Sequence, residues 1–360
     1  MFCTVALDVG ASLEIPTYYF FTSGAACLAL FLYFPTIHGN TTKSLKDLDS
    51  HLHCPGIPPV HPLDVSKPML DRTDKVYEDL LDFFSRLPES KGVLVNTFEA
   101  LEPTPLKAIL DGHCVPHRPT PPVYCIGPLI ADRKGSNGSG GGGRDPSATV
   151  DCLTWLDSQP IRSVVFLCFG SLGLFSAAQL KEIAIGLEKS GERSDQGQGP
   201  RGKALRPTGG STESKIGGGF VTHCGWNSVL EAICAGVPMV GWPLNAEQRL
   251  NRIFLVEEMK LALSMDESEG GFVSAAMVEK RVKELLGSEK GKVLRERTLA
   301  MRDAAKAAMA EDGSSRVALA ELWRRGWNRI INREINSMTD SLARKAKFAV
   351  GQTSWSISIP

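Results

Sequence analysis

The chain lacks an excess of charge of either sign, because 40 Lys and Arg residues balance 40 Asp and Glu residues. Proteins that bind nucleic acid or an anionic membrane by electrostatic attraction carry a net positive charge or a basic patch. The charged residues of the C-terminal third are strung along expected helices, which is typical of solvent-exposed faces. The composition therefore predicts no nucleic-acid partner. With 42% apolar residues, the 360-residue chain can form two globular domains.

The sequence also lacks any C-x-x-C pair. This absence favours reduced, buried thiols in a cytoplasmic protein over a disulfide framework or a zinc ribbon. His51, His53, Cys54 and His61 occur together in a proline-rich loop, but their spacing matches no established set of metal ligands, so no metal site is predicted. The nine cysteines are scattered, mostly within apolar runs, at Cys3, Cys27, Cys54, Cys114, Cys125, Cys152, Cys168, Cys224 and Cys234.

No hydrophobic run is long enough to predict a membrane span. The most apolar stretch, residues 18–34, is short for a spanning helix, has polar residues in its middle and lacks a basic flank. It is better explained by a buried strand through Phe21, an N-cap at Ser23 and a core helix that ends near Pro35. We therefore expect no stable membrane insertion.

Apolar strands alternate with helical patterns in the first part of the chain. Strands are expected at residues 16–22, 92–96 and 123–127. The segment 71–87 predicts an amphipathic helix with one apolar face, formed by Val76, Leu80, Leu81 and Phe84. Residues 133–148 are rich in glycine, which has no side chain to bury, and they predict a flexible surface loop.

A second domain is expected to begin near residue 151. Residues 164–169 form a continuous apolar run, which is typical of a central strand in a parallel sheet. Gly170 and Ser171 follow at its carboxyl end, where ligands of open α/β sheets bind, so Ser171 is a candidate contact for a phosphate. Further helices are expected at 176–189, 275–286, 292–311 and 315–325.

The most informative segment is 219–231, which predicts a strand, a tight turn and the start of a helix. Its polar residues gather at the turn: His223 ends the strand, Gly225 permits close approach of the backbone, and Asn227 and Ser228 are residue types that cap helices. The first amides of a helix point unpaired at whatever lies before them, which makes such a turn an anion site. The pattern predicts that a nucleotide diphosphate binds here.

These residues also carry a family resemblance. The segment resembles the signature box of plant UDP-sugar-dependent glycosyltransferases, through HCGWNS at 223–228, a glutamate three residues later, AGVP at 235–238, WPL at 242–244 and AEQ at 246–248. The resemblance extends outward to residues 18–23, 95–102, 126–129 and 168–171, and it covers most of 1–189 and 217–325. It implies an α/β fold of the GT-B type, in which two Rossmann-like domains face each other across a cleft.

The resemblance also implies roles for particular side chains. His223 would contact the diphosphate, Glu231 the ribose hydroxyls, and Glu247 and Gln248 the hydroxyls of the sugar. The implied donor site comprises Ser171, His223, Gly225, Trp226, Asn227, Ser228, Glu231, Glu247 and Gln248.

Several of these residues have a purely structural alternative. His223 could be a histidine that is hydrogen-bonded at a strand end, and Trp226 could belong to the core or to the cleft wall. Ser228 and Glu231 match a capping box, which satisfies helix amides without a ligand. Glu247 stands at an expected helix start, where an acidic side chain is stabilised by the helix dipole alone.

The implied function is the transfer of glucose from UDP-glucose, a co-substrate, to a hydroxyl of a flavonoid-like small molecule with inversion. No separate cofactor is expected, and the protein is expected to be a cytoplasmic monomer. The expected division of the chain is a partial acceptor-side domain at 1–132, a linker at 133–150, the UDP-sugar domain at 151–330 and an atypical tail at 331–360.

The sequence departs from the family pattern in two places. Residues 190–216 predict an irregular segment and lack the part of the box that contacts uracil. The family's general base and its aspartate would precede Met1, so the N-terminal domain is expected to be incomplete and no residue is assigned as catalytic; Asp8 does not fit the pattern. The alternative prediction is therefore an inactive fragment that retains only weak diphosphate binding.

Overall fold

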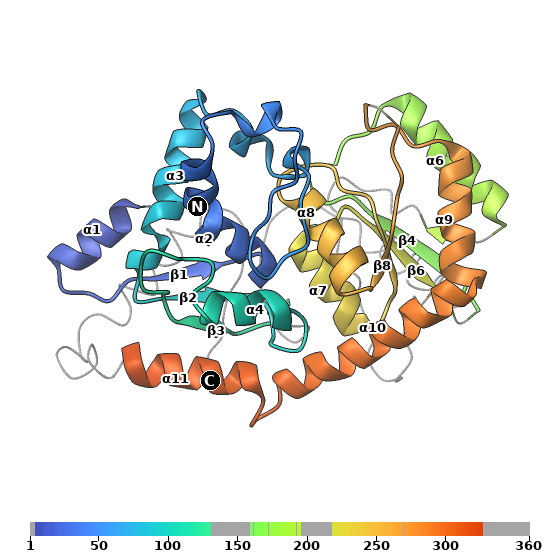
Figure 1. Ribbon diagram of the computed structural model, residues 1–360. Helices are drawn as coiled ribbons and strands as arrows, with labels where there is room; N and C mark the ends of the chain where they lie inside the picture. Colours follow the sequence, from blue (N-terminus) through green and yellow to red (C-terminus); the bar gives the residue numbers. More distant parts are fainter. Residues whose placement is uncertain are drawn as a thin grey trace, which may run out of the picture.

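Two α/β lobes make up the part of the chain that the computed structural model describes, which comprises residues 4–130, 159–160, 162–171, 173–191, 193–195, 218–268 and 270–326. The lobes lie side by side (Figure 1). The first contains a three-stranded parallel sheet in the order β1-β2-β3, and the second a five-stranded parallel sheet in the order β5-β4-β6-β7-β8. The expectation of two α/β units with parallel sheets is confirmed.

The regular elements follow the expected alternation of strands and helices. The first lobe contains α1 (Val5–Ser12), β1 (Tyr18–Phe21), α2 (Ala25–Asn40), η1 (Leu45–Asp47), η2 (Pro62–Asp64), η3 (Lys67–Met69), α3 (Lys75–Arg86), η4 (Leu87–Glu89), β2 (Gly92–Val95), α4 (Pro103–Leu110) and β3 (Val123–Cys125). The second sheet and its helices are β4 (Val164–Cys168), α6 (Ala177–Ser190), β5 (Arg193–Asp195), β6 (Gly219–Thr222), α7 (Trp226–Ala235), β7 (Met239–Gly241), α8 (Gln248–Ile253), η5 (Phe254–Glu258), β8 (Ala262–Ser264), α9 (Ala275–Gly287), α10 (Glu289–Ala308) and α11 (Ser314–Gly326).

Helix α2 accounts for the apolar stretch, and its ends differ from the prediction. The helix is buried along most of its circumference, as expected for one that is hydrophobic all round. It starts after Gly24 instead of Ser23, and it continues through Pro35 to Asn40, where the prediction ended it near the proline. Buried Phe34 and Ile37 flank the proline and hold this turn against the core. Among the described residues, no helix combines the length and apolarity needed to cross a membrane.

A distant carboxylate replaces the predicted Ser23 cap. Glu102 accepts hydrogen bonds from the amides of Ala25 at 2.8 Å and Ala26 at 2.9 Å, and another from the Thr97 hydroxyl at 2.5 Å. A carboxylate at a helix N-terminus satisfies unpaired amides and complements the helix dipole. Gly24 leaves room for this contact, because a Cβ there would lie 2.7 Å from Glu102 Oε1.

Two further predictions need correction. In α3 the buried residues are Tyr77, Phe83 and Phe84, whereas Val76 is 49% exposed and does not belong to the apolar face. Within the predicted irregular segment 190–216, Arg193–Asp195 forms strand β5, which pairs in parallel with β4. Residues 196–217, like the predicted loop 133–148 and tail 331–360, lie outside the described residues.

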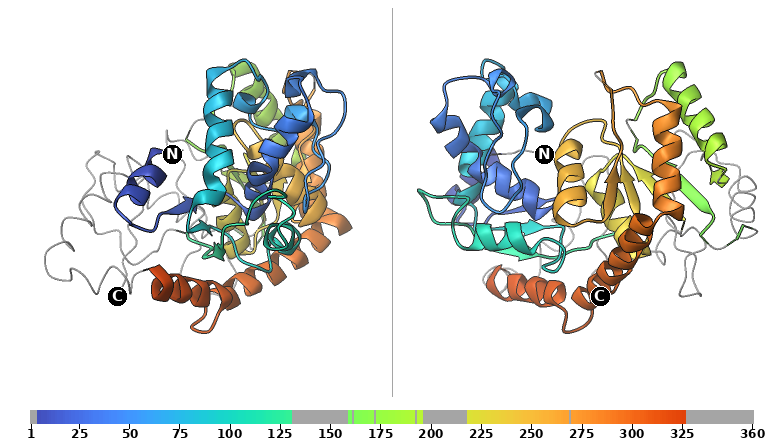
Figure 2. Two further views of the ribbon diagram at one scale, coloured as in Figure 1. Left: turned by 60° about the vertical axis from the view of Figure 1, so that its left-hand side comes forward. Right: turned by 45° about the vertical axis from the view of Figure 1, so that its right-hand side comes forward.

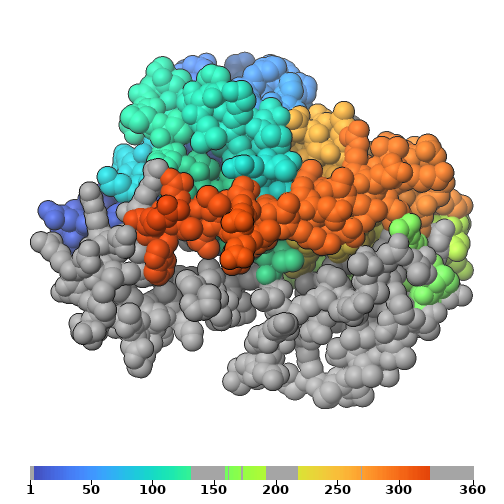
Figure 3. Space-filling model, turned by 90° about the horizontal axis from the view of Figure 1, so that it is seen from below, coloured from blue at the N-terminus to red at the C-terminus, as the bar shows by residue number. Residues whose placement is uncertain are grey.

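Each lobe contributes a few side chains to the hydrophobic core of the other. Leu250 and Ile253 of α8 and Phe254, the first residue of η5, belong to the hydrophobic cluster of the first lobe, while Phe98 and Leu101 belong to a cluster of the second. Figure 2 shows α8 between the lobes. Helices α10 and α11 run beneath both lobes, and α11 packs against β3 (Figure 3). The last helix of the predicted second domain therefore covers the first.

Glu102→Ala is expected to lower the free energy of unfolding by about 3 kcal/mol, because it leaves buried amides and the Thr97 hydroxyl without their acceptor. Glu102→Gln should also destabilise, since its amide nitrogen would face another donor. Urea unfolding of the purified variants measures both effects. Exposed Glu99, in the same segment, provides the control; a Glu102→Ala loss no larger than that of Glu99→Ala would refute the capping role.

Candidate functional site

The order of the second sheet locates a ligand site before any side chain is considered. Counted along the chain, the strand order β5-β4-β6-β7-β8 is 2-1-3-4-5, so the direction of winding reverses between β4 and β6. Ligands of open α/β sheets bind at the carboxyl ends of the strands beside this switch point. Cys168 and Thr222 are paired at those ends. The residues that follow them, including Ser171 and His223, are the ones that the sequence singled out.

The imidazole of His223 lies in a cradle formed by two glycines at this point. A Cβ on Gly170 would lie 2.8 Å from His223 Nε2, and a Cβ on Gly225 would lie 2.3 Å from it. Both positions therefore require glycine, and Gly170 also has a positive φ of 72°. The two glycines therefore let their backbone pack closely against the Nε2 edge of the His223 ring.

The other ring nitrogen of His223 fixes its tautomer. Nδ1 lies 3.3 Å from the carbonyl oxygen of Cys168, which can only accept, so Nδ1 carries the hydrogen. Burial lowers the pKa of His223, and the hydrogen bond to Cys168 opposes this shift without cancelling it. Near pH 7 the imidazole is therefore neutral, and Nε2 is an acceptor in the absence of a ligand. It donates to a phosphate oxygen only after taking up a proton.

Helix α7 begins two to three residues earlier than the capping residues Asn227 and Ser228 predicted. Its N-cap is Gly225, which makes no side-chain cap, so Asn227 and Ser228 lie within the first turn. The capping-box interpretation of Ser228 and Glu231 is therefore wrong, and both side chains are half-buried on the helix. The first amides of α7 follow His223 directly and receive no cap from Gly225, as expected for a helix start that binds an anion.

Trp226 joins the two lobes. Its indole nitrogen donates a 2.6 Å hydrogen bond to the carbonyl oxygen of Asn96, and its ring is 4% exposed. A Cβ on Gly24 would lie 2.7 Å from the indole. Asn96 also approaches Asn227, at 3.4 Å between the side-chain amides. Of the two alternatives for Trp226, core or cleft wall, the structure supports a buried residue at the lobe boundary.

Glu231 stands one helical turn beyond Ser228 on α7. Burial raises the pKa of its carboxyl to about 7. Any hydrogen-bond donor that reaches a carboxylate in such surroundings stabilises its ionised form, because the donor replaces part of the lost hydration. This property is compatible with the predicted contact to ribose hydroxyls, and that role stays a prediction.

Glu247 and Gln248 begin α8, as predicted. Glu247 is the N-cap of α8. The pKa of Cys27, near the start of α2, is raised by burial and, to a smaller extent, by the charge of Glu247. Gln248 Oε1 accepts from the amides of Leu244 at 2.9 Å and Asn245 at 2.8 Å. These bonds hold the loop after β7 and leave the Gln248 amide nitrogen as the group that can reach a ligand.

Sequence reasoning missed the contribution of the first lobe to this site. Asn96 and Glu102 occur in a segment recognised only by its resemblance, and Ser23 was expected to be a cap. The Ser23 hydroxyl is instead buried and lacks a conventional hydrogen-bond partner, with the Cys27 thiol beside it. Asp8, which did not fit the family pattern, forms an ion pair with Arg86 at the surface. His61, from the rejected metal cluster, accepts from the Leu63 amide.

The fold and site define a nucleotide-binding protein of the GT-B type, and the comparisons identify its family. A model described as UDP-glucoronosyl and UDP-glucosyl transferase matches residues 215–300. UDP-glycosyltransferase 88F3 of Pyrus communis is 48% identical over 355 residues, which cover 88% of this chain and 73% of the relative. A phloretin 2'-O-glucosyltransferase of Malus domestica is 48% identical over 357 residues, with the same shares covered.

A solved structure agrees with this relationship. Phytolacca americana UGT2, complexed with UDP-2fluoro-glucose and pterostilbene, is similar with a TM-score of 0.76 and 36% identity, over 90% of this chain and 74% of that one. The chain belongs to the UDP-glycosyltransferase family, whose members are glycosyl-transferring enzymes.

We expect UDP binding to add a proton to His223 at pH 7.5, because only the imidazolium donates from Nε2 while Nδ1 stays bonded to Cys168. Calorimetry in Tris and in HEPES, which differ in ionisation enthalpy and do not compete with a phosphate group, measures the net number of protons taken up. His223→Ala should lower the net proton uptake by up to one proton and weaken binding by about tenfold or more, whereas His113→Ala, at an exposed position, should change neither. The same net proton exchange in the unmodified chain and in His223→Ala would show that this tautomer is wrong.

The raised pKa of Glu231 predicts a stability difference that depends on pH. Its pKa is higher in the folded chain than in the unfolded one, so the folded state is favoured below pH 4.5 and loses this contribution as the pH rises through 7. Glu231→Gln should therefore raise the melting temperature at pH 8 and leave it nearly unchanged at pH 4.5. Scanning calorimetry at both pH values tests this, with exposed Glu188→Gln as control; equal changes at the two pH values would contradict it.

Proposed function

We propose that this chain binds UDP-glucose as its co-substrate and transfers glucose to a hydroxyl of a flavonoid-like small molecule with inversion. The observation that carries the proposal is the cradle in which His223 Nε2 lies between Gly170 and Gly225, directly before the start of α7. A diphosphate suits this position by its charge and by the hydrogen bonds that protonated His223 and the first amides of α7 can donate. The phloretin and pterostilbene named for two similar proteins support a phenolic acceptor.

Inversion follows from a single displacement. The acceptor oxygen attacks the anomeric carbon of glucose, and the bond between that carbon and the diphosphate oxygen breaks, with its electron pair passing to UDP. The proton of the acceptor hydroxyl passes to a base. The amides of α7 and protonated His223 stabilise the charge that develops on the departing diphosphate, because they are already oriented toward it. Glu231 would hold the ribose, and Glu247 and Gln248 the sugar.

The active unit and the compartment are part of the same proposal. Both lobes belong to one chain and share their hydrophobic clusters, so a monomer contains the whole described site. The described cysteines are free thiols, which is the usual state in a reducing compartment such as the cytoplasm.

The proposal is tested by measuring binding and turnover on the purified chain. Calorimetry should show that UDP-glucose and UDP bind and that uridine does not bind detectably, because the diphosphate provides the main contact. ADP should bind at least about tenfold more weakly than UDP, because a site that serves a UDP-sugar also selects the base. Incubation of UDP-glucose with phloretin or a flavonol should yield a glucoside of inverted anomeric configuration, detected by mass spectrometry and NMR.

The pattern of binding separates the proposal from its alternative. Equally weak binding of UDP and ADP, without any glucoside, would indicate a fragment that retains diphosphate binding alone. His223→Ala distinguishes specific from adventitious binding, because it removes the ring from the cradle and leaves the fold of α7 intact.

A further inference from the structure

Helix α8 connects the two lobes through its apolar face. Leu250, Ile253 and Phe254 are at most 8% exposed and belong to the hydrophobic cluster of the first lobe. The hydroxyl of Thr104, on α4 of the first lobe, donates a 2.7 Å hydrogen bond to Glu258 at the end of η5. The segment 248–258 is therefore held against the first lobe by packing and by this hydrogen bond, although in sequence it belongs to the second lobe.

The polar residues of α8 hold the loops of the expected donor site. Gln248 fixes the loop at Leu244 and Asn245, as described above. Asn251, one turn further along, donates from Nδ2 to the carbonyl oxygen of Cys224 at 3.0 Å and is 1% exposed. Cys224 lies in the turn between His223 and α7. A displacement of α8 would therefore move both the sugar-side residues and the turn of the diphosphate site.

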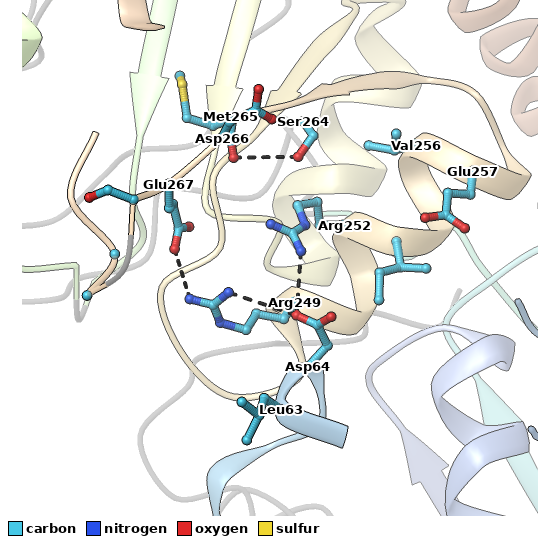
Figure 4. Close-up of a pocket in the computed structure, with 14 residues that line it drawn as sticks. Leu63, Asp64, Arg249, Arg252, Val256, Glu257, Ser264, Met265, Asp266 and Glu267 are labelled. Carbon is cyan, nitrogen blue, oxygen red and sulfur yellow. Dashed lines mark hydrogen bonds and ion pairs between the residues drawn. The ribbon is translucent and has the colours of Figure 1, made fainter. Parts of the chain in front are cut away.

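A third set of contacts comes from Asp64 in η2 of the first lobe. Its Oδ1 lies 3.5 Å from Arg252 Nη2 and 3.9 Å from Arg249 Nη1. Arg249 and Arg252 are three residues apart and so project from one face of α8. Arg249 also pairs with Glu267 at 2.9 Å, and Glu267 is 9% exposed. Figure 4 shows Asp64 of the first lobe between the two arginines, beside a cavity of about 620 Å³.

We propose that Asp64 is a positioning residue for the donor sugar: through Arg249 and Arg252 it fixes α8, and thereby Glu247 and Gln248, relative to the first lobe. The inference rests on the proposed function, since it gives Glu247 and Gln248 a sugar to contact. It adds that the acceptor-side lobe controls how tightly the donor sugar is held.

Partial burial strengthens the attraction between Asp64 and the two arginines. The side chains of Asp64 and Arg252 are 21% and 19% exposed, so their attraction is screened less than that of a surface pair. Removal of Asp64 leaves Arg252 without the carboxylate that it pairs with, while neighbouring Arg249 keeps Glu267, and the repulsion between the two guanidinium groups is then less compensated. Asp64 is held in place by η2, whose first turn is capped by the His61 ring.

The test compares Asp64→Asn with Asp111→Asn in the full chain. Asp111 pairs with Lys107 within the exposed surface of α4 and provides a matched loss of one carboxylate. Asp64→Asn should speed amide hydrogen exchange of residues 248–253 by about tenfold and weaken UDP-glucose binding by about tenfold, while UDP binding changes less than about twofold. Asp111→Asn should change none of these quantities. A smaller effect of Asp64→Asn in an Arg252→Gln background would confirm that Asp64 acts through Arg252.

The readouts separate this inference from the proposed function. Unchanged exchange at 248–253, or equal weakening of UDP and UDP-glucose, would overturn the role of Asp64. Failure of the unmodified chain to bind UDP-glucose would refute the proposed function, and the exchange rates, which need no ligand, would still decide whether Asp64 fixes α8.

Discussion

The described structure depends on one junction, at which the indole of Trp226 meets the carboxyl end of β2. The indole donates to the Asn96 carbonyl, and the ring lies against Gly24 at the start of α2. Glu102 caps α2 at the same place. The starts of two helices and the end of one strand therefore meet around a single buried side chain. Because Trp226 is the first residue of α7, this junction also sets where the expected diphosphate site lies relative to the first lobe.

Reciprocal packing of the lobes extends this constraint. Phe98 and Leu101 join the core of the second lobe, and Leu250, Ile253 and Phe254 join that of the first. Neither lobe can move away without exposing apolar side chains of the other, which costs about 25 cal/mol for each Å² that becomes exposed. Domain motions in such a protein would thus keep α8 and the segment 98–101 as fixed points. The Ser315 hydroxyl, which donates to the Gly127 carbonyl at 2.6 Å, adds a third link through α11.

Local sequence patterns were enough to predict the order of the elements and the location of the site. They were not enough to predict the contacts between residues far apart in sequence that hold the site together. Periodicity and the apolar runs predicted β4, β6, α7 and α9, and the switch point of the sheet lies where the polar turn was expected. The prediction failed where the deciding partner is remote in sequence. Glu102 is 77 residues from the amide of Ala25 that it caps, so Ser23 looked like the better cap. Ser228 and Glu231 matched a capping box, yet α7 starts earlier because Trp226 is held by Asn96, 130 residues away.

The protonation states of His223 and Glu231 have a common physical origin. Burial acts on His223 and on Glu231 in the same sense, since it disfavours the charged form of each: it lowers the pKa of the imidazole and raises that of the carboxyl. A diphosphate reverses this preference at His223, because its negative charge favours the imidazolium, whereas hydroxyl donors favour the carboxylate at Glu231. The two shifts take up and release a proton, respectively, and they oppose each other. Affinity for an intact nucleotide should therefore vary less with pH than either contact alone, and the balance between His223 and Glu231 decides the direction of the remaining slope.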